Sequence, residues 1–281
     1  MIRDFIFSVV PFILICTGAI YTKKAGTLAI FLEGAITLGA FSSFAILQLT
    51  DSFVLSIFCG AFIPGILFFF FEKFNELTNA NSLIFGIAIN LCITGFTSIM
   101  SYAVFGKSGV LYFSTKPQNS LLFLIIISVI SICFLIFTEL FLFHLKKGLA
   151  FRFCESGGNF LDSLYVDRKK IRAISWGICG ATGGLAGTFL SIKLASFSNG
   201  ISGGKGWIAL ALIFLASDKP ILAFIWSFVL TFTEFFARWL INNFSQMTQI
   251  QTLLQAIPFI AVLFFSGIIY FSRNSLSKKL S

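Results

Sequence analysis

The sequence predicts an all-α fold, a polytopic bundle of about nine (8–10) membrane-spanning helices with one or two broken or re-entrant segments. Of the 281 residues, 57% are hydrophobic and only 11% are charged, and 39 are Phe. Apolar runs long enough for a helix to cross a bilayer core of about 30 Å recur along the whole chain. A soluble domain of this size cannot bury so much apolar surface, and the alternating pattern of a membrane β-barrel is absent.

The expected helices follow these runs in order, because backbone groups in lipid must be paired within their own segment. The predicted spans are 5–21, 27–47, 53–71, 82–105, 121–144, 173–192, 207–217, 220–240 and 252–271. Together they form a single transmembrane domain, residues 1–281, interrupted by one long polar loop at 145–172.

The seventh span is unusual because 207–217 is too short to cross a membrane alone. The stretch before it, "SFSNGISGGKG", contains four glycines and several polar residues, which indicates a broken or re-entrant segment. A related pattern occurs early, in "KKAGTLAIFLEGAITLGA", where Glu33 and Gly34 are expected in the middle of a span. Two such segments suggest a weak internal duplication around a pathway at the membrane midplane.

The polar loop fixes the expected orientation. Residues 145–172 contain seven Lys or Arg residues and three acidic residues, a net charge of +4, so the loop is predicted to be cytoplasmic. With nine spans, the N-terminus is then outside and the basic C-terminal tail inside. The overall charge of +9 is therefore attributed to topology and anionic lipid, and nucleic acid is not an expected partner.

Polar residues within the spans are candidates for a solute pathway. Glu33 is the most prominent, since a carboxylate within a span normally faces a cavity or a partner. It can also serve a structural role, as a carboxylate or a neutral acid that makes a hydrogen bond to the backbone of a neighbouring helix. Asn90 can contact a polar solute or join two helices. Glu234 and Arg238, four residues apart, are expected to pair.

Several chemistries lack their signatures in the sequence. The six Cys residues are dispersed without a CxxC motif, and His144 is the only histidine, so no metal site is predicted. No Walker-type GxxxxGK[ST] loop occurs, so the chain is not expected to hydrolyse ATP itself. No catalytic residues are predicted, and an enzyme is the weaker class.

The sixth span is rich in glycines with small-xxx-small spacing, which allows close helix packing in lipid. Packing within the chain and a moving interface within a transporter both fit this pattern. The residues are Gly180, Gly183, Gly184 and Gly187.

Several blocks occur in a characteristic order: "AGTLAIFLEGAITLGAF", "GIAINLCITGFTSIMSYAVFG", "ESGGN…VDRKKIRAISWGICGATGGLAGTFLS", "GGKGWIALALIF" and "AIPFIAVL". Together they resemble the permease subunits of ABC importers in the ribose and branched-chain amino acid permease superfamily. The nucleoside and simple-sugar branch is the most similar, and the chain looks like the shorter of its two paired permeases. The resemblance covers roughly residues 11–269.

The resemblance implies that the cytoplasmic loop at 145–172 contains a turn and a short coupling helix that docks on an ATPase subunit. The Pro and paired Ala residues that the family has after this turn are absent here. Glycine allows the reversal, Asn159 can cap the helix, and apolar residues provide a face for a partner groove. The matching residues are Gly157, Gly158 and Asn159 in the turn and Phe160, Leu161, Leu164 and Tyr165 in the helix.

The resemblance further implies a multi-pass subunit of the bacterial cytoplasmic membrane that binds no cofactor directly. The expected partners are an ABC ATPase that uses ATP and Mg, a second permease that forms a heterodimer with this chain, and an extracytoplasmic solute-binding lipoprotein. The expected solute is nucleoside-like, and riboflavin or a simple sugar fits the same architecture. A secondary transporter driven by an ion gradient, with Glu33 as the ion or proton site, is the alternative from another class.

Overall fold

The computed structural model describes residues 2–107, 109–113, 120–155, 167–243 and 256–267. Nearly all of this chain is helical, with one two-stranded antiparallel ribbon, β1–β2. The elements are α1 (Ile2–Lys24), α2 (Leu32–Thr50), α3 (Phe53–Thr78), α4 (Ser82–Phe105), β1 (Leu111–Tyr112), α5 (Ser120–His144), α6 (Lys146–Glu155), α8 (Arg168–Leu194), β2 (Ser196–Phe197), α9 (Lys205–Leu215) and α10 (Pro220–Asn243).

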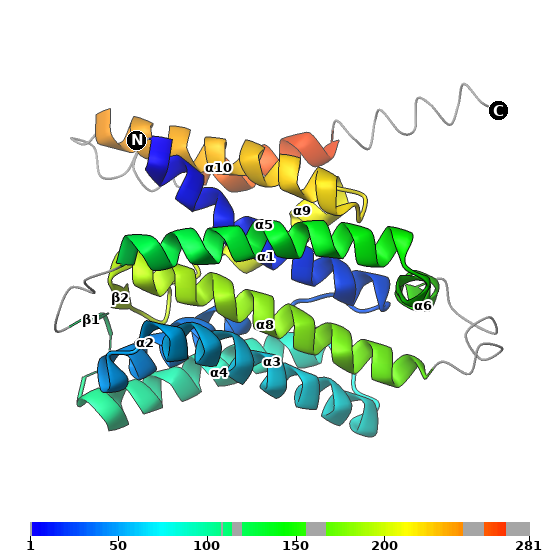
Figure 1. Ribbon diagram of the computed structural model, residues 1–281, viewed down its shortest axis with the longest axis horizontal. Helices are drawn as coiled ribbons and strands as arrows, with labels where there is room; N and C mark the ends of the chain where they lie inside the picture. The colour runs from blue at the N-terminus through cyan, green and yellow to red at the C-terminus, as the bar shows by residue number, and fades with distance from the viewer. Residues whose placement is uncertain (1, 108, 114–119, 156–166, 244–255, 268–281) are drawn as a thin grey trace.

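The long helices run roughly along one common direction, with α8 near the middle of the bundle (Figure 1). Helix α8 packs against α1, α2 and α3. The bundle has two distinct ends (Figure 1). We call the end with α6 and the first turn of α8 the basic end, and the end with β1 and β2 the strand end.

Seven helices in the described part of the chain are long and apolar enough to cross a membrane: α1, α2, α3, α4, α5, α8 and α10. Two shorter apolar helices, Lys205–Leu215 and Ile257–Gly267, overlap the other two expected spans. The predicted multi-pass helical bundle is therefore confirmed.

Some predicted boundaries are wrong. The second span is not one helix from residue 27, because 25–31 are non-helical and α2 begins at Leu32. Glu33 consequently lies in the first turn of a helix and not in its middle. Helix α8 begins five residues earlier than expected, because the Asp167 side chain accepts a hydrogen bond from the Lys169 N–H and caps it. Helix α6, within the polar loop, was not predicted.

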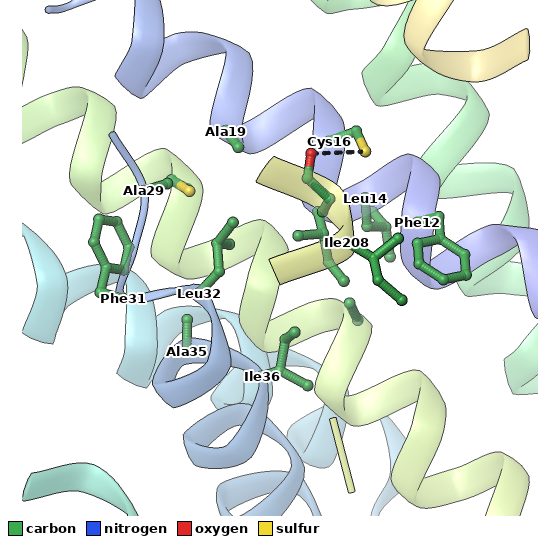
Figure 2. Packing of buried hydrophobic residues seen from close by; sticks show 14 of the residues in the cluster. Phe12, Leu14, Cys16, Ala19, Ala29, Phe31, Leu32, Ala35, Ile36 and Ile208 are labelled. Atoms are coloured by element: carbon green, nitrogen blue, oxygen red, sulfur yellow. Dashed lines mark hydrogen bonds between the residues drawn. The ribbon is translucent and has the colours of Figure 1, made fainter. Parts of the chain in front are cut away.

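Burial divides the helices into an inner and an outer set. In the most apolar 18-residue stretch of each helix, 89% of the residues of α1 are buried and 72% of those of α2 and of α8. In α3 and α4 the buried share is only 22%. Short α9 belongs to the inner set: Figure 2 shows Ile208 between Phe12 and Leu14 of α1 and Leu32 and Ile36 of α2. The outer helices expose apolar side chains to their surroundings, as expected in lipid.

Candidate functional site

The first interrupted segment enters the bundle as extended chain. After α1 ends at Lys24, Gly26 adopts a left-handed conformation (φ +81°), and the chain stays non-helical until Leu32. The Trp176 indole N–H donates to the Thr27 hydroxyl at 3.1 Å, and the Phe31 ring lies 4.1 Å from that of Trp176. These contacts hold the extended half against α8, in the interior.

The second interrupted segment follows α8. Ala195 is left-handed, residues 196–197 form β2, and turns lead through Gly203 and Gly204, both at positive φ, into α9. Glycine is suited to these conformations because it has no Cβ. Like the first segment, this one is half irregular and half helical, but here the irregular half lies towards the strand end.

The two segments meet at their breaks. The Glu33 carboxylate, in the first turn of α2, accepts hydrogen bonds from the backbone N–H groups of Gly206 (2.8 Å) and Trp207 (3.4 Å) in the first turn of α9. The residue that precedes α9, Gly204, offers no side-chain cap, so Glu33 caps this helix from another segment. A Cβ on Gly206 would lie 2.9 Å from the Glu33 nitrogen, so the close approach requires glycine.

The two half-helices leave this meeting point in opposite directions. Helix α2 runs towards the strand end, where the ring of Phe44 lies near that of Phe197. Helix α9 runs towards the basic end, where Asp218 forms an ion pair with Lys24 at 3.1 Å. Both helix N-termini, the positive ends of their dipoles, therefore face the interior at one level. This arrangement is typical of transporter sites at the membrane midplane.

Asn90 of α4 completes the first break. Its Nδ2 donates to the Ile30 carbonyl at 2.7 Å, and its Oδ1 accepts from the Gly34 N–H at 2.8 Å. The Asn90 amide thus pairs the Ile30 carbonyl and the Gly34 N–H, which have no partners in a regular helix because the chain is non-helical before Leu32. In the structure Asn90 joins α4 to the break, and the side chain remains partly exposed.

A polar row continues from Asn90 along α4. Thr94 and Ser98 follow at intervals of four residues on the same helix face; Thr94 is exposed and Ser98 partly exposed. Asn199, in the second interrupted segment, donates to the Ser98 hydroxyl and accepts from Thr97 at 3.4 Å. Sequence reasoning identified Asn90 but missed Thr94, Ser98 and Asn199, although the spacing of four on an apolar helix was a usable signal.

Trp207 adds an exposed aromatic side chain to the junction at Glu33. It follows Gly206 in α9, and 46% of it is exposed although its backbone N–H is bound to Glu33. The Glu33 carboxylate, the Asn90 amide and one indole thus belong to the region where the two segments break, and further hydroxyls and the Asn199 amide continue from it along α4. Such a set can hydrogen-bond and stack against an uncharged polar solute with a ring.

A charged cluster lies behind α9, away from α4. Lys205 donates to Glu234 at 3.0 Å, and Arg238 donates to the other oxygen of Glu234 at 3.2 Å. The predicted pairing of Glu234 and Arg238 is therefore confirmed, with Lys205 as a third member that was not expected. Charges within a span are costly unless paired, and here they join α9 to α10.

The glycines of α8 lie at its contacts with α2 and α3. A Cβ on Gly184 would lie 2.2 Å from the Gly60 carbonyl oxygen, and one on Gly187 would lie 2.0 Å from the Ile36 carbonyl oxygen. A Cβ on Gly180 or Gly183 would also be crowded, by Pro64 and by Ala35. Backbone therefore meets backbone along this helix.

The expected coupling residues, 157–161, 164 and 165, lie outside the described residues. The chain on either side is described. Burial raises the pKa of the Cys154 thiol in α6, and Arg172 of α8 pairs with the fully buried Glu72 of α3 at 3.5 Å. No group of three His, Cys, Asp or Glu side chains in the described ranges is placed to hold a metal ion.

The sequence is similar to those of transport permeases. The family model for the permease component of the branched-chain amino acid transport system matches residues 1–263. A guanosine ABC transporter permease of Bacillus subtilis is 25% identical over 233 residues, which cover 75% of this chain and 73% of the relative. A putative glucose ABC transporter permease of Haloferax volcanii is 24% identical over 230 residues, covering 72% and 66%. No solved structure matches the chain.

Proposed function

Because the chain belongs to the family of branched-chain amino acid transport permease components, we propose that it forms the membrane pathway of an ATP-driven importer for a nucleoside. The family and the helical bundle show that the chain is a multi-pass permease subunit of an ABC transporter. Its solute, its partners and its orientation in the membrane are what we propose.

One observation carries the proposal most directly: two interrupted segments meet at Glu33 and Gly206, beside a polar row on α4. Irregular backbone at membrane depth is tolerated where it lines a cavity or is buried in protein. The polar groups there are mostly hydroxyls and amides, which suit an uncharged polar solute. The exposed indole of Trp207 suits a flat ring, and the guanosine permease among the relatives carries such a solute.

A simple sugar is the second candidate, because one relative is described as a putative glucose permease. Hydroxyls and amides bind sugar hydroxyls as well as they bind ribose, so the polar row does not separate the two. The exposed Trp207 indole can stack on a nucleobase or on riboflavin and can also lie against the apolar face of a sugar ring, so uptake of each solute must separate the candidates.

The proposed mechanism is alternating access powered by partner subunits. A binding lipoprotein would deliver the solute on the outer face of the bacterial cytoplasmic membrane, and an ATPase with ATP and Mg would act on the cytoplasmic loop. A second permease would complete the pathway. A secondary transporter that uses Glu33 as a proton site is less favoured, because its carboxylate already accepts two backbone hydrogen bonds.

Uptake by proteoliposomes that contain the reconstituted complex tests the proposal. Vesicles loaded with ATP and Mg should accumulate guanosine or another nucleoside, and vesicles without ATP should not. Riboflavin and glucose serve as parallel solutes. Uptake that follows an ion gradient without ATP would contradict the importer, and ATP-dependent uptake of glucose alone would contradict the nucleoside.

A further inference from the structure

A second polar hollow lies at the basic end, separate from the meeting point of the interrupted segments. It is a pocket of about 520 Å³ between the turn that joins α3 to α4, the end of α1, the end of α6 and the first turn of α8. This volume is within the range of small-ligand sites, about 300–1,000 Å³. The lining residues are Ala25, Gly26, Asn75, Glu76, Asn79, Ala80, Ser82, Cys154, Arg168, Lys169 and Arg172.

Asn75 gives the pocket its most informative group. Its side chain is fixed, because Nδ2 donates to Glu72 at 3.1 Å and to Ser82 at 3.0 Å, and the residue is only 3% exposed. Its Oδ1 nevertheless makes no hydrogen bond within the described chain. A buried acceptor without a donor costs about 1–3 kcal/mol, so a group that supplies the donor is expected there.

Three more buried polar atoms of the pocket residues make no hydrogen bond within the described residues. They are Oε1 of Glu76, an acceptor, and Nε of Arg168 and of Arg172, both donors; Nε of Arg172 has only the ion pair with Glu72. The pocket therefore offers unmatched groups of both kinds. A bound molecule must both accept from arginine and donate to Asn75 and Glu76.

The charge of the wall selects among such molecules. Arg168 and Lys169 contribute two positive charges, Arg172 contributes a third that is paired with Glu72, and Glu76 contributes one negative charge. Arginine and lysine together are the usual ligands of phosphate oxygens. Basic pockets between helices at a membrane surface bind lipid head groups in this way.

We propose that this pocket binds a phosphate group whose substituent carries hydrogen-bond donors. The phosphate accepts from Arg168 and Lys169, and the substituent donates to Asn75 Oδ1 and Glu76 Oε1. Two sources share this chemistry: the head group of phosphatidylethanolamine, with its ammonium, and a soluble phosphate ester with hydroxyl groups. Bound there, either molecule would join the first turn of α8 to the last turn of α3.

Native mass spectrometry of the purified transporter complex tests the lipid source. Phosphatidylethanolamine and phosphatidylcholine have the same net charge, but only the former has N–H donors. We expect the complex to retain phosphatidylethanolamine about tenfold more than phosphatidylcholine at equal concentration. In the soluble arm, sn-glycerol 3-phosphate should bind at least tenfold more tightly than methyl phosphate, which lacks hydroxyl donors.

Preference in either arm supports the site and identifies its source. Lys169→Ala should reduce the preferred binding several-fold, and Arg168→Ala should reduce it more. Lys170→Ala is the matched control, because this neighbouring lysine is exposed, does not line the pocket and lies 3.9 Å from Asp167. The proposal would be overturned if phosphatidylethanolamine and phosphatidylcholine were retained equally and sn-glycerol 3-phosphate and methyl phosphate also bound equally. Equal binding by the Lys169→Ala and Lys170→Ala variants would overturn it as well.

Discussion

Glu33 and Gly206, separated by 173 residues in the chain, are joined by a hydrogen bond of 2.8 Å from the Gly206 N–H to the Glu33 carboxylate. This bond connects the first turns of α2 and α9, the two half-helices that begin inside the bundle. The carboxylate lies where the positive ends of both helix dipoles converge, so its charge is favoured there.

Replacing Glu33 should loosen this junction. Glu33→Ala leaves the Gly206 N–H unpaired in the interior, and we expect the free energy of unfolding to fall by about 1–3 kcal/mol. Glu33→Gln retains an acceptor oxygen and should lose less. Thermal unfolding of the purified chain in detergent measures both, and an alanine variant as stable as the wild type would contradict the capping role.

Gly187→Ala should destabilise the bundle, because its Cβ would lie 2.0 Å from the Ile36 carbonyl oxygen. Overpacking of this kind costs about 1–3 kcal/mol. Gly95→Ala is the control, since nothing lies within 4 Å of a Cβ there and alanine favours a helix by about 0.5–1 kcal/mol. The two changes should shift the melting temperature in opposite directions; shifts of the same sign would argue against the packing.

Arg172→Met should be costly because it leaves the Glu72 carboxylate, which is 0% exposed, without its ion-pair partner. Breaking a buried pair costs about 3–5 kcal/mol, and the partial exposure of Arg172 places the expected loss near the lower limit. The double variant Glu72→Met/Arg172→Met should recover much of this stability. Chemical unfolding measures the free energy of unfolding of each variant. A double variant no more stable than Arg172→Met would reject the pairing.

Trp207→Ala should raise the half-saturation concentration for a nucleoside about tenfold, equivalent to one lost stacking contact of about 1.4 kcal/mol. Trp207→Phe retains a ring and should lie close to the wild type. ATP-dependent uptake by proteoliposomes measures both variants. Unchanged uptake by the alanine variant would remove Trp207 from the solute pathway.

Phe160→Asp or Leu164→Asp should uncouple ATP hydrolysis from transport, since both residues are expected on the apolar face that docks on the ATPase. ATP turnover and solute uptake are measured in parallel on the reconstituted complex. Normal coupling in both variants would reject the docking assignment.

The positions of the spans could be predicted from the sequence, because apolar runs of sufficient length have one stable solution in lipid. An interruption near Glu33 could also be predicted, but its position before Leu32 could not, since "TLAIFLE" is as apolar as a helix and composition does not distinguish extended chain from helix. Glu33 was correctly selected as important, but nothing local identified Gly206 as its partner. Such a contact depends on how two distant segments pack, which a single sequence does not encode locally.

Three glycines from three helices, Gly39, Gly184 and Gly60, lie against one another, with Gly184 in the middle. A methyl group at Gly39 or Gly184 meets main-chain atoms of a facing glycine, which has no side chain left to shorten, whereas one at Gly60 meets the side chain of Thr188. Compensating mutations at the facing glycine are therefore ruled out by geometry for Gly39 and Gly184. A genetic suppressor of a substitution here must instead shift the axis of an entire helix, and we expect such suppressors to map to the connecting turns.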